Sequence, residues 1–201
     1  PVLTPSLQFG QSFTFDLHSK KSPFYGISDL HEQMEIRDRL MEQHNADVGI
    51  GSYAEKRFIY ETVRLFSANT NNRNVHLGID LMVTPDSVVM APLDATVHSL
   101  QNNQELGDYG PTLILQHQLE DARFYTLYGH LRKDCLKRWE PGDKVNGGEI
   151  IAHVGKHSEN GDWPPHLHFQ IIEDVGAYKG DYPGVCSEDE TDYFLQNCPD
   201  P

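Results

Sequence analysis

The chain has 201 residues, and 30 Asp and Glu residues against 16 Lys and Arg give it a formal net charge of −14. Such a charge repels phosphate backbones and anionic lipid headgroups, so neither nucleic acid nor a membrane surface is an expected partner. Hydrophobic residues make up 38% of the chain, enough for a folded core, and no apolar run approaches the ~18 residues of a transmembrane helix. The length predicts one domain with an appended segment.

The N-terminal third, residues 1–67, is expected to be an extension with one clear helix. Apolar residues recur at helical spacing between Leu30 and Met41. Asp29 precedes Glu32 by three positions, as in a capping box. This pattern predicts a helix over about 28–44.

Three further segments of this third carry weaker signals. The run VGIGS over 48–52 is interpreted as a turn, since it lacks the lysine and spacing of a phosphate-binding loop. A second helical or extended segment is predicted over 55–66. The polar run 68–74 is interpreted as a loop that precedes the main unit.

From Val75 onward the sequence predicts β structure. Short runs rich in β-branched and aromatic residues alternate with turn residues, without intervening helices, which favours an antiparallel sheet or a barrel-like sandwich. Asn146-Gly147 lies between two such runs and predicts a hairpin, because both positions of its tight turn favour positive φ. The main unit is placed at 68–180, and a tail or linker at 181–201. The predicted strands are 88–100, 112–119, 123–131, 149–154 and 167–172.

Cysteine usage and the N-terminus bear on localisation. The three cysteines are odd in number and lack CxxC spacing, which argues against a disulfide framework and a structural zinc knot. Residues 1–20 lack the charged start and apolar core of a signal peptide. A cytoplasmic location is therefore expected. The alternative is an exported protein whose signal was trimmed, since the chain begins with Pro1.

Three histidine motifs lie within the predicted β region: HLGID from His76 to Asp80, YGHL around His130, and HLH from His166 to His168. Side chains alternate along a strand, so the two members of HLH share a face, as do the two ends of HLGID. Two imidazoles and a carboxylate are the ligands of a catalytic zinc, which keeps a fourth position for water. Each motif alone is usually an ordinary surface or packing feature, whereas together they predict a metal site.

These motifs resemble those of the M23 zinc metallopeptidases, lysostaphin-like enzymes that cut glycine-containing cell-wall cross-links. The likeness covers about residues 75–172. Besides the histidine motifs it includes VVMAPLDATV at 88–97, DYG at 108–110, PGDKV at 141–145 and PHLHF at 165–169.

The resemblance implies a fold, a cofactor and residue roles. The fold would be mainly β, an antiparallel lysostaphin-like barrel-sandwich (duplicated hybrid motif), with the partly helical extension in front of it. Zn²⁺ would be held by His76, Asp80 and His168, and the catalytic histidines would be His130 and His166. One of the two would move the proton of a zinc-activated water and the other would stabilise the oxyanion, in an order that the sequence does not assign.

The sequence departs from the family at several positions. The loop before HLH, residues 156–165, reads KHSENGDWPP where the family usually has Gly, Ser and Thr. Residues 68–75 contain no Tyr, although many members carry one there to steady the oxyanion. Ala95 and Gln170 stand where Gly and Glu are common and are expected to affect packing only. Trp163 is interpreted as a packed aromatic residue or a substrate platform.

A wider likeness concerns the flanks. Segments 48–66, 161–165, 180–185 and 198–201 resemble the middle module of large fusion proteins, in which a kinase-like phosphotransferase precedes an M23-like module and a class III aminotransferase follows it. Two functions stay open. The first is a zinc-dependent metalloendopeptidase with a peptide or peptide-like substrate. The second is a non-catalytic zinc-binding adaptor, covalently linked to kinase-like and aminotransferase domains.

Overall fold

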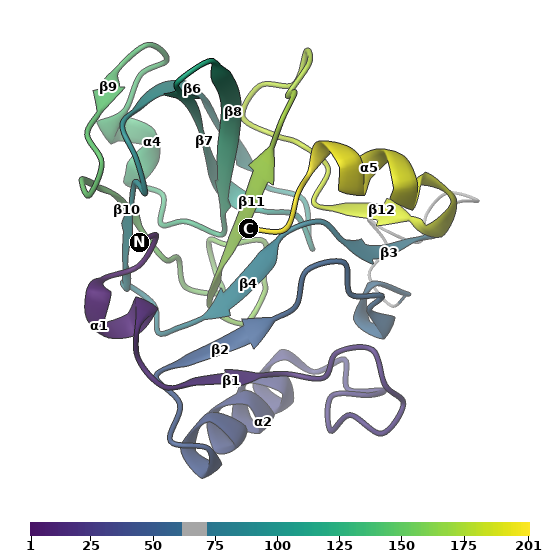
Figure 1. The fold of residues 1–201 in the computed structure, drawn as a ribbon. Coiled ribbons are helices and arrows are strands. Elements are labelled where there is room, and N and C mark those ends of the chain that lie inside the picture. The colour runs from purple at the N-terminus through teal and green to yellow at the C-terminus, as the bar shows by residue number, and fades with distance from the viewer. Residues whose placement is uncertain (62–71) are drawn as a thin grey trace.

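The computed structural model describes residues 1–61 and 72–201. Its architecture is mainly β, as the sequence predicts (Figure 1). The strands are β1 (Ser12–Thr14), β2 (Val48–Gly51), β3 (Arg73–His76), β4 (Ile79–Met82), β5 (Val88–Met90), β6 (Ala95–Asn103), β7 (Gly110–Leu119), β8 (Ala122–Gly129), β9 (Lys144–Val145), β10 (Ile150–His153), β11 (His166–Ile172) and β12 (Val185–Ser187). The helices are α1 (Pro5–Gln8), α2 (Leu30–Gln43), α4 (Cys135–Arg138) and α5 (Thr191–Asn197), with 3₁₀ turns η1 (Phe58–Glu61) and η2 (Glu188–Glu190).

Eight strands form the main sheet in the order β1-β2-β4-β11-β8-β7-β6-β9, so β1 and β9 are its two edges. Two smaller sheets pair β10 with β5 and β12 with β3. All of these pairings are antiparallel except the parallel pair β1–β2. No helix within residues 1–61 and 72–201 is long and apolar enough to cross a membrane.

The N-terminal extension enlarges the main sheet. The prediction of a turn over 48–52 is wrong, because β2 pairs with β4 and places Gly51 opposite Asp80. A run of alternating glycines carries little strand propensity, but the glycines are needed here: a Cβ on Gly49 would lie 2.2 Å from the ring of Phe15. Tertiary packing thus makes a strand out of a sequence that resembles a turn.

The predicted helix over 28–44 is present as α2. The carboxylate of Asp29 accepts a hydrogen bond from the backbone N–H of Glu32 at 2.9 Å, which caps the helix. Ile36 on α2 belongs to a small core with Phe15 and Phe24, which fastens the helix to the β1–β2 end of the sheet (Figure 1).

Two other predictions are corrected. Asn146-Gly147 does not join a hairpin, because β9 pairs with β6 and β10 pairs with β5. The positive φ of 82° falls on Gly148 instead. The single strand predicted over 88–100 is split into β5 and β6. Within 55–66 the structure describes an isolated β-bridge of Lys56 with Val75 and a 3₁₀ turn, and within 68–74 it describes the start of β3. Residues 62–71 lie outside the described part of the chain.

The C-terminal residues pack against the β region. In β12, Val185 pairs with His76, the last residue of β3. Cys186 and Cys198 are buried in a core cluster that also contains Leu77 and Tyr182. Residues 181–201 therefore contribute a strand, a helix and core side chains, rather than the tail or linker that the sequence suggests.

Candidate active site

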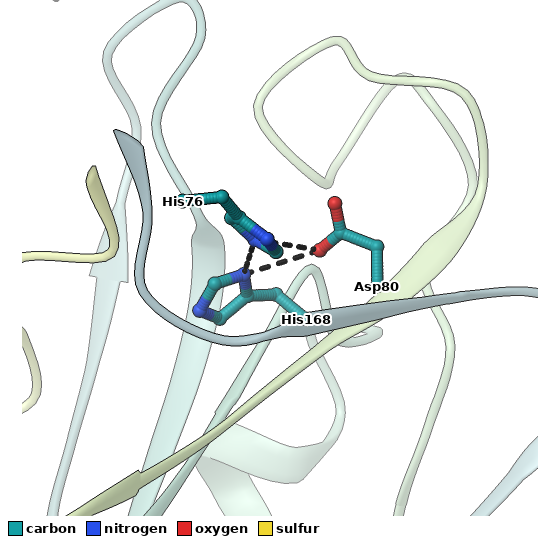
Figure 2. Close-up of side chains that lie close together, drawn as sticks. All are labelled: His76, Asp80 and His168. Carbon is teal, nitrogen blue, oxygen red and sulfur yellow. Dashed lines mark hydrogen bonds and ion pairs between the residues drawn. The ribbon is translucent and has the colours of Figure 1, made fainter. Parts of the chain in front are cut away.

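Three side chains with metal-binding atoms converge where β3, β4 and β11 meet (Figure 2). Asp80 on β4 lies directly opposite His168 on β11 in the antiparallel register, and His76 ends β3. His76 Nε2 lies 3.0 Å from His168 Nδ1, and Asp80 Oδ1 lies 3.3 Å from the first atom and 3.1 Å from the second. Ligand atoms of a tetrahedral zinc lie about 3.3–3.5 Å apart, so this spacing is close to that of a metal site.

The outer ring nitrogens of both histidines face hydrogen-bond acceptors, and this fixes their protons. His76 Nδ1 lies 3.0 Å from the carbonyl oxygen of Ser52, and His168 Nε2 lies 3.0 Å from Oε1 of Gln170. Both of these nitrogens are therefore donors, which leaves lone pairs on His76 Nε2 and His168 Nδ1. Two lone pairs and the Asp80 carboxylate facing one another repel unless a cation lies between them, so the donor set fits zinc.

Burial sets the protonation of these groups. The exposed fraction is 1% for His76 and 3% for Asp80. Burial, together with the charge of Arg57, lowers the pKa of His76 to about 4. Burial alone would raise the pKa of Asp80, but His76 and Arg57 outweigh it and hold that pKa well below its ordinary range. A neutral imidazole and an ionised carboxylate at pH 7 are the forms that bind a metal.

The prediction that His76 and Asp80 share one strand is wrong, because they lie on strands of different sheets, separated by Leu77 and Gly78. The glycine is still necessary. A Cβ on Gly78 would lie 2.5 Å from the carbonyl oxygen of Phe169 and 2.9 Å from His168 Nε2. The space beside Gly78 is occupied by the third predicted ligand.

His130 and His166 lie beside this cluster. Their ring centroids are 4.2 Å apart, and His166 Nε2 lies 3.6 Å from Asp80 Oδ1. Burial lowers the pKa of His166 below its ordinary value and that of His130 well below it. Both rings are therefore neutral at pH 7. All five residues singled out from the sequence are brought together.

The atypical loop 156–165 orients both of these histidines. His130 Nδ1 lies 2.7 Å from the carbonyl oxygen of Asn160, and His166 Nδ1 lies 2.7 Å from that of Pro164. The Asn160 side chain in turn bonds to the backbone of Trp163, which holds the loop in shape. Because Nδ1 is the donor in each ring, Nε2 of each neutral ring carries no proton.

Arg57, which the sequence did not single out, reaches the site from the N-terminal extension. Its Nη1 lies 2.5 Å from Asp80 Oδ2, and its Nε lies 3.0 Å from Glu55 Oε2. It precedes Asp80 by 23 positions in a stretch without a clear periodic pattern, so no local signal links the two.

Gln170 is the second residue that sequence reasoning misjudged, since it does more than pack. Besides accepting from His168, its amide nitrogen donates to the carbonyl oxygen of Pro183 at 3.1 Å and to Cys198 Sγ at 3.2 Å. These two bonds orient the amide, so the C-terminal residues help to fix the proton of His168.

A cavity of about 350 Å³ adjoins the site and is lined in part by Asp80, His130, His166 and His168. Four tyrosines outside residues 68–75 line it, and two of them, Tyr60 and Tyr109, contact residues of the site. The Tyr109 hydroxyl lies 3.5 Å from His168 Nε2, and Tyr60 accepts a hydrogen bond from Arg57. Trp163 also lines the cavity, with its ring edge-on to that of Tyr60. Aromatic side chains from distant segments thus enclose the space next to the metal-binding atoms.

The remaining histidines do not join the cluster. His117, for example, bonds to the carbonyl oxygen of Asp94 and to Thr126 inside the sheet. Another His-containing group, Asp16, His18 and Glu55, is mostly exposed.

Parts of the chain are similar to known proteins. A protein of Haemophilus influenzae described as an uncharacterized metalloprotease is 34% identical over 96 residues, which are 48% of this chain and 18% of that protein. Among solved structures, a zinc-containing peptidase from Vibrio cholerae is 27% identical with a TM-score of 0.41, over 55% of this chain and 32% of that one. The catalytic domain of lysostaphin from Staphylococcus simulans is 22% identical with a TM-score of 0.42, over 63% of this chain and 84% of that one.

The chain spans less than a fifth of the Haemophilus protein and about a third of the Vibrio chain. The sequence profile of peptidase family M23 matches residues 74–180. This match covers over half of the chain and all five site residues predicted from the sequence, so this chain belongs to peptidase family M23.

Proposed function

We propose that this chain is a zinc-dependent metallopeptidase that hydrolyses an amide bond in a peptide or peptide-like substrate. The observation that carries the proposal is the convergence of His76 Nε2, Asp80 Oδ1 and His168 Nδ1 beside two neutral histidines. A structural zinc is normally closed by four protein ligands, whereas three groups of this kind converge here in the described part of the chain. Three ligands leave one position for water or substrate.

Zinc held by His76, Asp80 and His168 would lower the pKa of its bound water to about 7 and polarise the scissile carbonyl. His130 and His166 begin as proton acceptors, because their Nε2 atoms carry no proton in the neutral rings. The one that takes the proton of the attacking water becomes an N–H donor and passes that proton to the leaving amine.

The developing oxyanion also needs a hydrogen-bond donor. Burial raises the pKa of Tyr60 and that of Tyr109 above the ordinary value, so both hydroxyls stay protonated at neutral pH. Both residues line the cavity. We assign to one of these hydroxyls the role that the resembled family gives to a tyrosine near the first ligand.

The cavity supports a small substrate. Its volume of about 350 Å³ is near the lower end of the roughly 300–1,000 Å³ of small-molecule pockets. His130 and His166 are only 5% and 6% exposed, so a bulky cross-linked polymer has little access to them. A short peptide is the better fit.

The proposed location is the cytoplasm. A net charge of −14 opposes approach to anionic wall polymers, although physiological salt screens this effect beyond about 8 Å. Cys135, Cys186 and Cys198 are all free and buried, as suits a reducing compartment.

The test combines metal analysis with cleavage assays. Purified protein is expected to hold close to one equivalent of zinc and to cleave members of a library of short peptides, with purified peptidoglycan as the competing substrate. Failure to take up zinc would contradict the proposal, and release of muropeptides would overturn the cytoplasmic part of it. Full zinc occupancy without cleavage of either substrate would favour the adaptor function within a larger fusion protein.

A further inference from the structure

Each of the three side-chain nitrogens of Arg57 makes at least one hydrogen bond within the protein. Nε bonds to Glu55, Nη1 bonds to both Asp80 Oδ2 and the Tyr60 hydroxyl, and Nη2 lies 3.3 Å from the carbonyl oxygen of Ser52. The side chain is 3% exposed. A guanidinium with this many fixed contacts has little capacity left to bind substrate, so its contacts serve the groups around it.

The two oxygens of Asp80 have different partners. Oδ1 faces the nitrogens of His76 and His168, whereas Oδ2 accepts from Arg57. A carboxylate oxygen that accepts from a guanidinium is a weaker metal ligand than a free one, and the ion pair also fixes the orientation of the carboxylate. The contact with Arg57 therefore favours coordination through Oδ1 alone.

Residues 52–57, the segment that contains Arg57, also contact His76, the second proposed ligand. Ser52 accepts from His76 Nδ1, and backbone hydrogen bonds run from Ala54 N–H to the carbonyl of His76 and from His76 N–H to the carbonyl of Glu55. Residues 52–57 thus contact both His76 and Asp80, and they lie outside the 74–180 match to the peptidase family.

We propose that Arg57 is a positioning residue of the metal centre, which holds Asp80 Oδ2 so that the ion keeps an open coordination position. This inference rests on the proposed zinc site. It also means that the N-terminal extension completes the centre that the family region begins.

Cobalt spectroscopy tests the inference without a substrate. The full chain is stripped of metal and reloaded with Co²⁺, and the visible absorption is measured per cobalt bound. The wild type is expected to show the strong bands of a four-coordinate ion. In Arg57→Gln, Asp80 is released to bind through both oxygens, so the coordination number rises and the absorption per cobalt falls at least about twofold.

Two further variants separate positioning from general loosening. Glu55→Gln removes the other ion pair of Arg57 and leaves the contact with Asp80, so its spectrum should equal that of the wild type. Arg57→Lys keeps the charge but not the planar guanidinium, so its absorption per cobalt should lie between that of the wild type and that of Arg57→Gln. If Arg57→Gln does not fold, Arg57→Lys tests the inference alone.

The results that would contradict the proposed zinc site differ from those that would contradict the role of Arg57 alone. A wild-type chain that binds neither Co²⁺ nor zinc removes the proposed function and this inference with it. A wild-type spectrum in both Arg57 variants overturns the inference alone, as does an equal loss in Glu55→Gln.

Discussion

At His130 and His166, one ring nitrogen donates to a backbone carbonyl and the other is left without a proton. The carbonyls belong to Asn160 and Pro164, in the loop whose sequence departs most from the family. The atypical loop therefore preserves the tautomers that proton transfer requires, even though its sequence has changed.

Replacing either histidine should separate metal binding from chemistry. His130→Ala and His166→Ala are expected to keep zinc occupancy and to lose hydrolysis by the roughly 10²- to 10⁴-fold of general acid–base groups. Elemental analysis and single-peptide kinetics check this. Loss of zinc from either variant would show that the ligand assignment is wrong.

The acid limb of the pH–rate profile should have its midpoint below the ordinary pKa of histidine. Because burial lowers the pKa of His130 and of His166, both bases stay unprotonated at pH values where an exposed histidine is charged. The measurement is kcat/KM of the zinc-loaded protein from pH 4.5 to 8, with metal content checked at each end. A midpoint at or above about 6.5 would contradict the neutral pair.

Gln170 offers a matched pair of substitutions. Gln170→Leu removes the acceptor of the His168 Nε2 proton and should weaken zinc binding by about 10- to 100-fold, as is typical of outer-sphere partners. Gln170→Glu keeps an acceptor and should bind zinc more tightly than Gln170→Leu. Competition with a chromophoric chelator measures both, and equal affinities would contradict the role given to this residue.

The sequence predicts His76, Asp80, His130, His166 and His168 because their motifs are short and local. The contacts of Arg57 and Gln170 are not predictable in this way. Arg57 contacts Asp80 across 23 positions of sequence, and the importance of Gln170 depends on Pro183 and Cys198, which only the fold brings near.

At the scale of elements, the bend at Gly78 brings His76 and Asp80 face to face from separate strands. Gly78→Ala should reduce zinc affinity strongly, because its Cβ would lie 2.9 Å from His168 Nε2 and 2.5 Å from the rigid backbone oxygen of Phe169. Gly147→Ala is the control, since Gly147 does not have a left-handed φ and its Cβ would come no closer than 3.3 Å to other atoms. Equal zinc affinity in both variants would contradict this account.

Elements with a strong internal pattern were predictable. The α2 helix has helical spacing and a cap at Asp29, and the strands of the β region have clear apolar runs. Strand β2 and the partners of β9 and β10 were not predictable, because a glycine-rich run has no intrinsic preference and Asn146-Gly147 specifies a turn without specifying which strands it joins. Pairing with distant strands decided both.

For the whole molecule, the ligands come from three strands of two sheets, so metal binding should stabilise the fold. Zinc at 100 times its dissociation constant is expected to raise the free energy of unfolding by about 2.7 kcal/mol, and a chelator should reverse the gain. Thermal unfolding with and without zinc measures this. Asp80→Ala, which lacks the anionic ligand, should show a much smaller shift, and an equal shift would place the bound zinc elsewhere.

The orientation of Gln170 has an evolutionary consequence. A glutamate at this position lacks the N–H groups that donate to Pro183 and Cys198, so only an amide satisfies both the histidine and the C-terminal residues. Glutamine at this position is therefore expected in relatives whose C-terminal segment packs as residues 181–198 do here, and a glutamate is expected where that segment is missing.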